Sequence, residues 1–344
     1  MFPMQRERGN RCMRIIFSIM IAALAALVVM LATLYLSENT QSSDKPPQVA
    51  PLYHIQLVTQ SGNEHFWTML KKGAQSAAAD NNVYVEFVDI AQREVELSVQ
   101  AVDYAIYAGV DGIALQAADL ARTEAALSAA TSGGLAVITF ENDVFFTRNA
   151  ATVGSNSYDI GYDAGKMGAK ACSGRAKVAV LIDDMSEEDE GISPYKNLKL
   201  QGMMEAFSEY AAMELVGVYS LSSGMFDVEK VTTRILEEHP EVSLVICTQE
   251  KSTPGVAQMV VDANRVGDIM VVGYGAMPQT LEYIDRDVIY GTICPNAYEI
   301  GYTTVTQLFN LLQGKQISDL INTGVYAITA ENLAEYEETF SAQE

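Results

Sequence analysis

The sequence has 344 residues, 49% of them hydrophobic, and a formal net charge of −22 at pH 7. A chain of this length can bury one large core or two ordinary ones, and we expect two lobes. A strongly acidic surface repels phosphate backbones, so the composition argues against nucleic acid as a partner.

An uncharged apolar run near the N-terminus predicts a membrane anchor. The run spans residues 15–36 and is long enough to cross a bilayer as a helix. All four arginines of this region precede it, so the positive-inside rule places residues 1–14 in the cytoplasm as a short tail. The alternative is a cleaved signal peptide, but the run is longer than the usual apolar region of one and no clean small-x-small cleavage site follows. We therefore expect a single-pass protein of the cell membrane whose folded part is extracytoplasmic.

The next segment, residues 37–51, reads "SENTQSSDKPPQVAP". Its polar, Ser-bearing and Pro-bearing composition predicts a tether that holds a folded domain off the membrane. Cys12 lies before the apolar run, where a lipidated cysteine cannot sit, so lipid anchoring is not supported.

From His54 onward, short β-branched runs alternate with Ala-rich segments of helical length. Expected strands are 54–60, 83–90, 111–117, 135–141, 177–183, 215–221, 243–248, 269–275, 288–294 and a short one at 324–328. A helix at 156–172 follows Gly154, and we expect the last helix at 296–313. Such alternation predicts an α/β fold with parallel sheets in two lobes of similar construction.

Polar and aromatic residues gather where these strands end, for example in "QSGNEHFW", "FENDVFF", "TQEK" and "YGAMP". In open parallel sheets, ligands bind beyond the carboxyl ends of the strands. Carboxylates, amides and flat aromatic rings together suit a sugar or polyol, because hydroxyls need acceptors and donors while C–H faces need a ring. Any single residue has a simpler explanation, such as an aromatic that pins the first turn of a helix to the core. The set as a whole predicts a ligand site.

Several motifs resemble the type I periplasmic binding proteins, and among them the ribose-binding-like sugar receptors. The motifs are "NEHFWTMLKKGAQSAA", "GVDGIALQAAD", "LAVITFEND", "VGSNSYDIGYDAGKMGA", "IMVVGYGAMPQTLEYI" and "GTICPNAYEIGY", within a resemblance that runs from about Pro51 to Tyr336. The resemblance implies two Rossmann-like lobes joined by three crossings near residues 154, 295 and 324. Lobe 1 would take 52–154 with 296–323, and lobe 2 would take 155–295 with 324–344.

The same resemblance implies a set of ligand-binding residues. In such receptors the aromatic pair after the first strand lies against the sugar ring. The implied set is Gln60, Glu64, Phe66, Trp67, Gln116, Glu141, Asn142, Asn197, Phe226, Gln249 and Tyr274.

The chain departs from the family pattern at several of these positions. The Asp–Arg pair after the fourth strand appears as Glu141–Asn142, and an Arg at a helix start appears as Asn197. An Asp after the strand near 274 appears as Gly275, and a Gln at the crossing near 295 appears as Pro295. A missing buried polar partner costs about 1–3 kcal/mol, so these changes together exclude ribose itself.

The two glutamates near the predicted site favour a neutral or cationic ligand over an anionic one. Without an adjacent Arg, Glu141 and Glu250 can accept hydroxyls from a sugar or pair with an amine. Both have the alternative explanation of solvated loop carboxylates in a very acidic protein.

The sequence does not predict an enzyme, a metal or a cofactor. It contains no nucleophile elbow, no H-E-x-x-H motif and no P-loop, and its histidines His54, His65 and His239 are scattered. Glu141 with Glu250 would be the only candidate pair for glycoside hydrolysis. The acidic run "DDMSEEDEG" lacks the spacing of a calcium loop.

Three cysteines, Cys172, Cys247 and Cys294, lie in the exported part. Their odd number and the lack of a C-x-x-C pair favour buried free thiols, with a single Cys247–Cys294 bridge left open.

We therefore expect a receptor that captures a small neutral sugar or polyol and delivers it to an ABC permease. The alternatives are a co-receptor that presents its ligand-bound state to a membrane histidine kinase or chemoreceptor, and a receptor for an amine-bearing ligand. Sugar-responsive transcriptional regulators of the LacI type share the same core, but the predicted membrane helix and the acidic body argue against DNA binding.

Overall fold

The computed structural model describes residues 24–30, 33, 50–60, 65–90, 95–116, 120–141, 151–183, 197–221 and 225–341. The chain divides into two compact units, Met1–Ala50 and Pro51–Glu344. Most of the predicted anchor, with the tail and nearly all of the tether, lies outside the described residues. Among those that are described, no helix is both long and apolar enough to cross a membrane.

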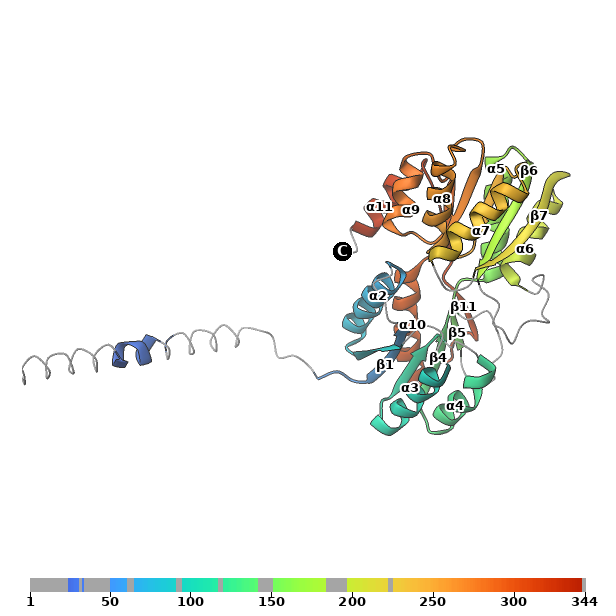
Figure 1. Ribbon diagram of the computed structural model, residues 1–344. Helices are drawn as coiled ribbons and strands as arrows, with labels where there is room; N and C mark the ends of the chain where they lie inside the picture. The colour runs from blue at the N-terminus through green and yellow to red at the C-terminus, as the bar shows by residue number, and fades with distance from the viewer. Residues whose placement is uncertain are drawn as a thin grey trace, which may run out of the picture. The chain divides into compact units, whose positions relative to one another are not determined.

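The unit Pro51–Glu344 contains two six-stranded sheets, each with helices on both faces (Figure 1). Sheet A has the order β11-β5-β4-β3-β1-β2, and all of its strands are parallel. Its strands are β1 (His54–Gln60), β2 (Tyr84–Ile90), β3 (Gly112–Leu115), β4 (Ala136–Phe140), β5 (Ala151–Gly154) and β11 (Leu320–Asn322).

Sheet B has the order β12-β10-β9-β8-β6-β7 and is parallel except for β12, which pairs antiparallel with β10. Its strands are β6 (Arg175–Asp183), β7 (Ala212–Leu221), β8 (Leu244–Cys247), β9 (Met270–Tyr274), β10 (Gly291–Pro295) and β12 (Val325–Thr329). The two-lobed α/β fold with mainly parallel sheets is therefore confirmed. We call sheet A with its helices lobe 1, and sheet B with its helices lobe 2.

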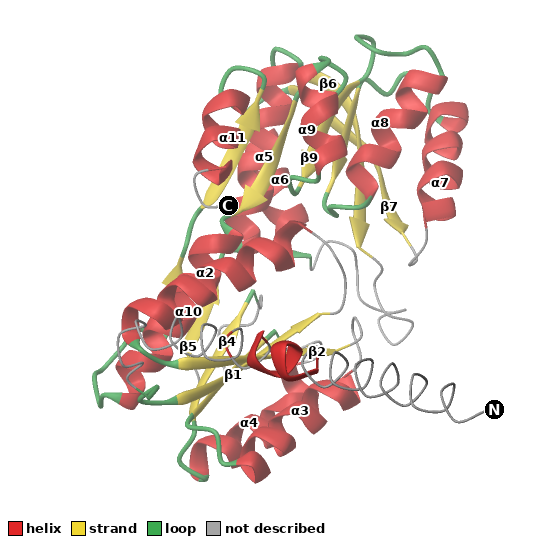
Figure 2. Ribbon diagram, turned by 90° about the vertical axis from the view of Figure 1, so that its left-hand side faces the viewer, coloured by secondary structure: helices red, strands yellow, loops and turns green. Residues whose placement is uncertain are grey.

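Helices cover both faces of each sheet (Figure 2). In lobe 1, α2 (His65–Asn81) packs against α10 (Ala297–Leu312), and α3 (Val95–Ala108) packs against α4 (Leu120–Ser132). In lobe 2, α5 (Ser157–Ala171) packs against α6 (Leu198–Ser208), and α7 (Met225–Glu238) against α8 (Ser252–Asp262). The remaining helices of lobe 2 are α9 (Pro278–Asp285) and α11 (Leu333–Ser341).

The alternation of side chains along each strand explains why two helical layers are needed. In β1, Ile55 and Leu57 join the hydrophobic cluster that contains Leu70 of α2 and Ile300 of α10, whereas Val58 joins the cluster of α3 and α4. Successive side chains of a strand point to opposite faces, so a strand that is apolar on both faces must be covered on both.

Two helix pairs approach each other through glycines. A Cβ on Gly73 would lie 1.9 Å from the carbonyl oxygen of Tyr298, and one on Gly301 would lie 2.0 Å from that of Leu70. The α5–α6 pair of lobe 2 repeats the device, since a Cβ on Gly161 would lie 1.8 Å from the Lys199 carbonyl oxygen. No side chain fits at these distances, so glycine sets the helix spacing.

The chain passes between the lobes three times. The first crossing lies between β5 and α5, the second between β10 and α10, and the third between β11 and β12. Asn156 and Asn296 end the first two crossings as N-caps, with side chains that accept backbone N–H groups of α5 and α10.

Three elements depart from the sequence expectations. The strands β5 and β11 were not expected, because each is only three or four residues long. β5 becomes a strand by pairing with β4 and β11, and β11 by pairing with β5 alone. The expectation that the helix at 296–313 is the last one is wrong, since α11 follows it. Burial of its Leu333 and Tyr336 side chains holds this helix against the rest of the protein.

Candidate functional site

The carboxyl ends of both sheets lie at the crossings. β5 ends at Gly154, where the first crossing begins, and the other strands of sheet A run parallel to it. β10 ends at Pro295, where the second crossing begins, and β9, β8, β6 and β7 share its direction. Residues that follow these strands are therefore carried to the region where the lobes are joined, which is where ligands bind in folds of this kind.

At the end of sheet A, Gln116 and Glu141 are brought into contact. The Nε2 of Gln116, after β3, donates to the carbonyl oxygen of Glu141 at 3.1 Å. The Oε1 of Glu141, after β4, accepts the backbone N–H of Ser155 at 2.6 Å. Glu141 has a left-handed backbone with φ of 48°, which is uncommon outside glycine. Both residues are half-buried.

The two aromatic residues at the start of α2, Phe66 and Trp67, differ in how deeply they are buried. The Trp67 ring is only 5% exposed and lies edge-on to Phe140 with a centroid distance of 6.3 Å. Phe66 lies edge-on to Trp67 at 5.0 Å and is half-buried. The simpler explanation, an aromatic that pins the first turn of the helix to the core, therefore holds for Trp67. Phe66 is the more accessible of the two rings.

At the end of sheet B, Thr253 holds the two predicted residues Gln249 and Tyr274 together. Its hydroxyl contacts the Gln249 carbonyl oxygen at 3.0 Å, and it also contacts the Tyr274 carbonyl oxygen at 3.1 Å and the Tyr274 N–H at 3.0 Å. The backbones after β8 and β9 are thus tied to each other. The side chains of Gln249 and Tyr274 are half-buried.

Asn197 has a helix-capping contact. Its Oδ1 accepts the backbone N–H of Leu200 at 3.1 Å, which makes it the N-cap of α6. Two residues further on, the Nζ of Lys199 lies 4.3 Å from the centre of the Tyr274 ring and 3.5 Å from the carbonyl oxygen of Thr248. The cation at the start of this helix is therefore Lys199.

Sequence reasoning missed Lys199, because it matched the family's arginine to Asn197. The available signal was a basic residue in the first turn of the same helix. Within the described part of the chain, no carboxylate forms an ion pair with Lys199. Its half-buried ammonium can therefore donate to a bound molecule.

Glu250 occupies space beside Gly275, where the family pattern has an aspartate. A Cβ on Gly275 would lie 2.5 Å from the Cγ of Glu250, and φ of 80° also favours glycine there. A side chain at 275 would therefore collide with Glu250. The carboxylate in this part of the structure is therefore that of Glu250, and position 275 is a glycine.

The thiol of Cys294, at the end of β10, lies in the same region. Burial raises the pKa of Cys294 to about 12, and the negative charges of Glu250 and Glu141 add to this shift. The two glutamates come from different lobes, so their shared effect on one thiol indicates that both carboxylates lie near the second crossing. Tyr336 of α11 has its hydroxyl 3.9 Å from the Cys294 sulfur.

The remaining predicted site residues lie outside what the structure describes. Glu64 and Asn142 fall between described segments, and nothing is described of the side chains of Gln60 and Phe226. Their assignment stays a prediction.

The cysteines and histidines add no metal site to this region. Cys172, Cys247 and Cys294 are free, so the Cys247–Cys294 bridge that the sequence left open is not formed. Among the described residues, no group of three or more His, Cys, Asp or Glu side chains could hold a metal ion.

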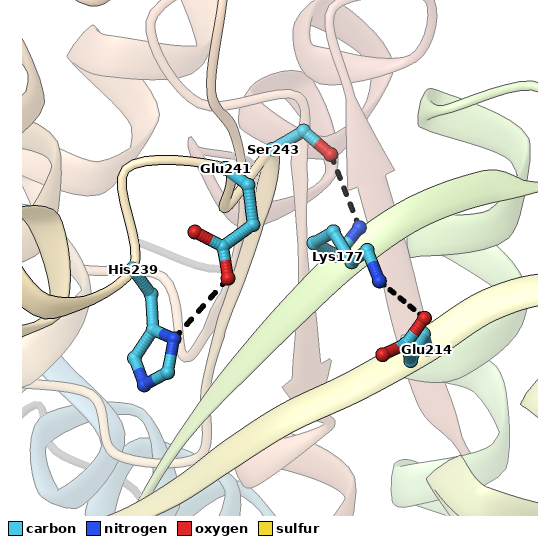
Figure 3. Close-up of polar contacts among 5 residues, drawn as sticks. All are labelled: Lys177, Glu214, His239, Glu241 and Ser243. Carbon is cyan, nitrogen blue, oxygen red and sulfur yellow. Dashed lines mark hydrogen bonds and ion pairs between the residues drawn. The ribbon is translucent and has the colours of Figure 1, made fainter.

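His239 lies at the opposite, amino-terminal end of sheet B (Figure 3). Its Nδ1 contacts Glu241 at 3.3 Å, and nearby the Lys177 N–H donates to the Ser243 hydroxyl at 3.3 Å while the Lys177 ammonium contacts Glu214. This cluster ties together the starts of β6 and β8 and takes no part in the site.

Residues 55–316 match a family model described as the periplasmic binding protein domain. The D-allose-binding periplasmic protein of Escherichia coli (strain K12) is 20% identical over 256 residues, covering 72% of this chain and 80% of that protein. The structure of a glucose-galactose binding protein from Geobacillus stearothermophilus has a TM-score of 0.74 and 25% identity, covering 82% of this chain and 98% of that one. A XylFII–LytSN complex contains a chain with a TM-score of 0.71 and 23% identity, covering 82% and 99%.

These matches confirm two expectations from the sequence. The resemblance to the type I periplasmic binding proteins holds, and the relatives are binding proteins, as expected for a chain that is not an enzyme. Because the match spans well over half of its residues, this chain belongs to the periplasmic binding protein domain family.

Proposed function

We propose that the protein is an extracytoplasmic receptor that captures a small neutral sugar or polyol between its two lobes and delivers it to an ABC permease. The observation that carries the proposal is the set of polar groups at the carboxyl ends of both sheets. Lobe 1 contributes Gln116 and Glu141, and lobe 2 contributes Lys199, Glu250 and Tyr274. The named relatives bind D-allose and glucose or galactose, which supports a sugar as the class of ligand.

Each group has a role that its chemistry suggests. Carboxylate and amide oxygens accept sugar hydroxyls, and the Lys199 ammonium donates to hydroxyl oxygens. The C–H face of a sugar ring packs against an aromatic ring. Phe66 is better placed for this than Trp67, because it is half-buried and Trp67, which lies edge-on to it, is buried in the core. Gln60, Glu64, Asn142, Asn197, Phe226 and Gln249 complete the proposed set.

The charges favour a neutral ligand, with an amine-bearing one as the alternative. Among the described groups that form the proposed site, Glu141 and Glu250 outnumber Lys199, so a fully anionic ligand would meet repulsion from two carboxylates. A neutral sugar can use acceptors and a donor together, whereas an amine would use only the carboxylates.

The proposal includes a single-pass anchor at residues 15–36, with the tail inside the cell and the binding lobes outside. The support is the length of the apolar run and the arginines that precede it. Intact-mass measurement of the protein from membranes tests it. A mass that includes residues 1–36, together with retention in the membrane after alkaline carbonate washing, is expected. A shortened protein in the soluble extracytoplasmic fraction would indicate a cleaved signal peptide instead.

The ligand is tested by thermal unfolding of the protein with neutral sugars, polyols, amino sugars and sugar acids at matched ionic strength. A ligand that binds only the native state raises the midpoint by an amount that follows the logarithm of its concentration over Kd. A shift with a neutral sugar or polyol is expected. A shift with amino sugars alone would support the amine-bearing alternative, and no shift with any compound would contradict solute capture.

Delivery to a permease is a separate question from binding. If the receptor serves transport, deleting its gene should abolish uptake of the radiolabelled ligand. If uptake is unchanged while a ligand-dependent transcriptional response is lost, the protein instead serves a membrane sensor.

A further inference from the structure

Glu141 makes contacts that an ordinary ligand-binding carboxylate does not need. It follows β4 directly, and its own N–H donates to the carbonyl oxygen of Val153 at 2.9 Å. Its Oε1 then accepts the N–H of Ser155 at 2.6 Å, two residues after Val153 and just beyond the end of β5. The residue therefore bonds to the chain on both sides of Gly154, at the point where the first crossing leaves sheet A.

The Glu141 carboxylate fills the space that a side chain at position 154 would need. Gly154 is buried, and a Cβ there would lie 2.5 Å from the Oε1 of Glu141. Only a glycine leaves room for the carboxylate to reach the Ser155 N–H. Glu141 reaches this N–H from a left-handed backbone with φ of 48°, a conformation that is uncommon outside glycine.

The hydrogen bonds continue from the first crossing to the third. The Ser155 hydroxyl donates to the carbonyl oxygen of Gly324 at 3.1 Å, and the Thr323 N–H donates to that of Gly154 at 3.1 Å. Gly324 and Thr323 form the link between β11 and β12. A chain of hydrogen bonds thus runs from Glu141 through the first crossing to the third, while the charge of Glu141 also acts on Cys294 before the second.

We propose that Glu141 is the positioning residue of the hinge. Its carboxylate holds the start of the first crossing against the end of β4, and through Ser155 it also holds the third crossing. The backbone of the hinge therefore has one defined conformation from which the lobes close. The proposal rests on the proposed function only in its consequence for affinity. A receptor whose hinge is already ordered loses less conformational freedom when the lobes close on a ligand.

The test compares three variants of the full chain with the wild type. Glu141→Ala removes the acceptor, Glu141→Gln keeps an acceptor oxygen of nearly the same reach, and Ser155→Ala breaks only the link to Gly324. Hydrogen–deuterium exchange is measured by mass spectrometry on peptides covering residues 151–160 and 320–328. Peptides from the β1 and β6 cores serve as the internal control for global stability.

In Glu141→Ala the amide of Ser155 should exchange about tenfold faster or more, since a hydrogen bond to a charged group contributes roughly 1.5–3 kcal/mol and about 1.4 kcal/mol is a factor of ten. Glu141→Gln should restore most of the protection. Ser155→Ala should speed exchange at 320–328 while the backbone amide at position 155, still bonded to Glu141, stays protected. The core peptides should be unchanged in all three variants.

Faster exchange in every peptide of Glu141→Ala, core included, would show a general structural role and overturn the proposal. Unchanged exchange at residues 151–160 would overturn it as well. If a ligand has been found, Kd should rise about tenfold in Glu141→Ala and recover in Glu141→Gln, again following the hydrogen-bond energy. A large loss of affinity in both variants, with normal exchange, would leave Glu141 with its ligand-binding role alone and would overturn the hinge role. The exchange measurement needs no ligand. It therefore tests the hinge role of Glu141 even if the sugar screen finds no ligand.

Discussion

Two adjacent aromatic residues illustrate how neighbours in sequence can have different roles. Trp67 packs into the cluster that includes Phe140 and Leu70, whereas Phe66 is only half-buried. A pattern of two aromatics after a strand indicates a functional junction, but it does not say which ring supports the fold and which is available to a ligand. The backbone direction of α2 decides this.

We predict that Trp67→Ala and Phe66→Ala separate stability from binding. Trp67→Ala should lower the free energy of unfolding by about 3–5 kcal/mol, because it leaves a cavity against Phe140. Phe66→Ala should lower it much less but weaken sugar binding. Denaturant unfolding and calorimetric titration measure the two effects, with Tyr107→Ala on the exposed surface of α3 as the control. Normal sugar affinity in Phe66→Ala would contradict the proposed stacking.

At the scale of elements, the two lobes use the same device to join a pair of helices. The α2–α10 pair and the α5–α6 pair each bring backbones close through glycines. α10 arrives in lobe 1 only after the second crossing, so this contact closes a loop of more than 200 residues between the two ends of the lobe.

We predict that Gly73→Ala and Gly301→Ala destabilise lobe 1. Each Cβ would lie within about 2 Å of a backbone oxygen of the facing helix, so the helices must separate. Overpacking of this kind costs about 1–3 kcal/mol or more, which should appear as a lower denaturant midpoint. The matched control is Gly133→Ala at the end of α4, where the nearest atoms are 3.3 Å away. Equal stability in the three variants would show that the helix spacing adapts.

Element prediction succeeded where a segment carried its own pattern and failed where pairing created the element. β1, β6 and β8 have apolar runs long enough to identify from sequence. β11 is three residues long and pairs with a strand more than 150 residues earlier, so the local sequence does not predict it. The helix α11 was missed because its buried Leu333 and Tyr336 stand among exposed acidic residues.

At the scale of the whole molecule, the two buried thiols of sheet B report on the integrity of lobe 2, and Cys294 does so next to the second crossing. Burial raises the pKa of Cys247 and of Cys294 from 9.0 to about 12. A thiol held neutral in the folded state and able to ionise in the unfolded state favours unfolding at alkaline pH. The contribution of these thiols to stability is therefore fully present below about pH 9 and is lost as pH rises towards 12.

We predict that neither thiol reacts with a maleimide in the native protein at pH 8, whereas Cys172, which is half-buried, reacts before both of them. In urea all of the thiols should react at one fast rate. Mass mapping of labelled peptides measures this, and a Cys172→Ser variant gives the background for the two buried sites. Fast native labelling of Cys294 would show that the region near the second crossing opens without global unfolding.

The sequence by itself determined the α/β class, the parallel sheets and the carboxyl ends of strands as the place to search, because short-range alternation is written along the chain. Through the resemblance to the family, it also led to Gln116, Glu141 and Tyr274 as members of the proposed site. Only the tertiary structure assigned the roles within it: Asn197 caps a helix while Lys199 presents the charge, and Glu250 takes the space beside Gly275. The reason is physical. Which atoms meet at the crossings depends on contacts between residues far apart in the chain. Local sequence patterns do not predict such contacts.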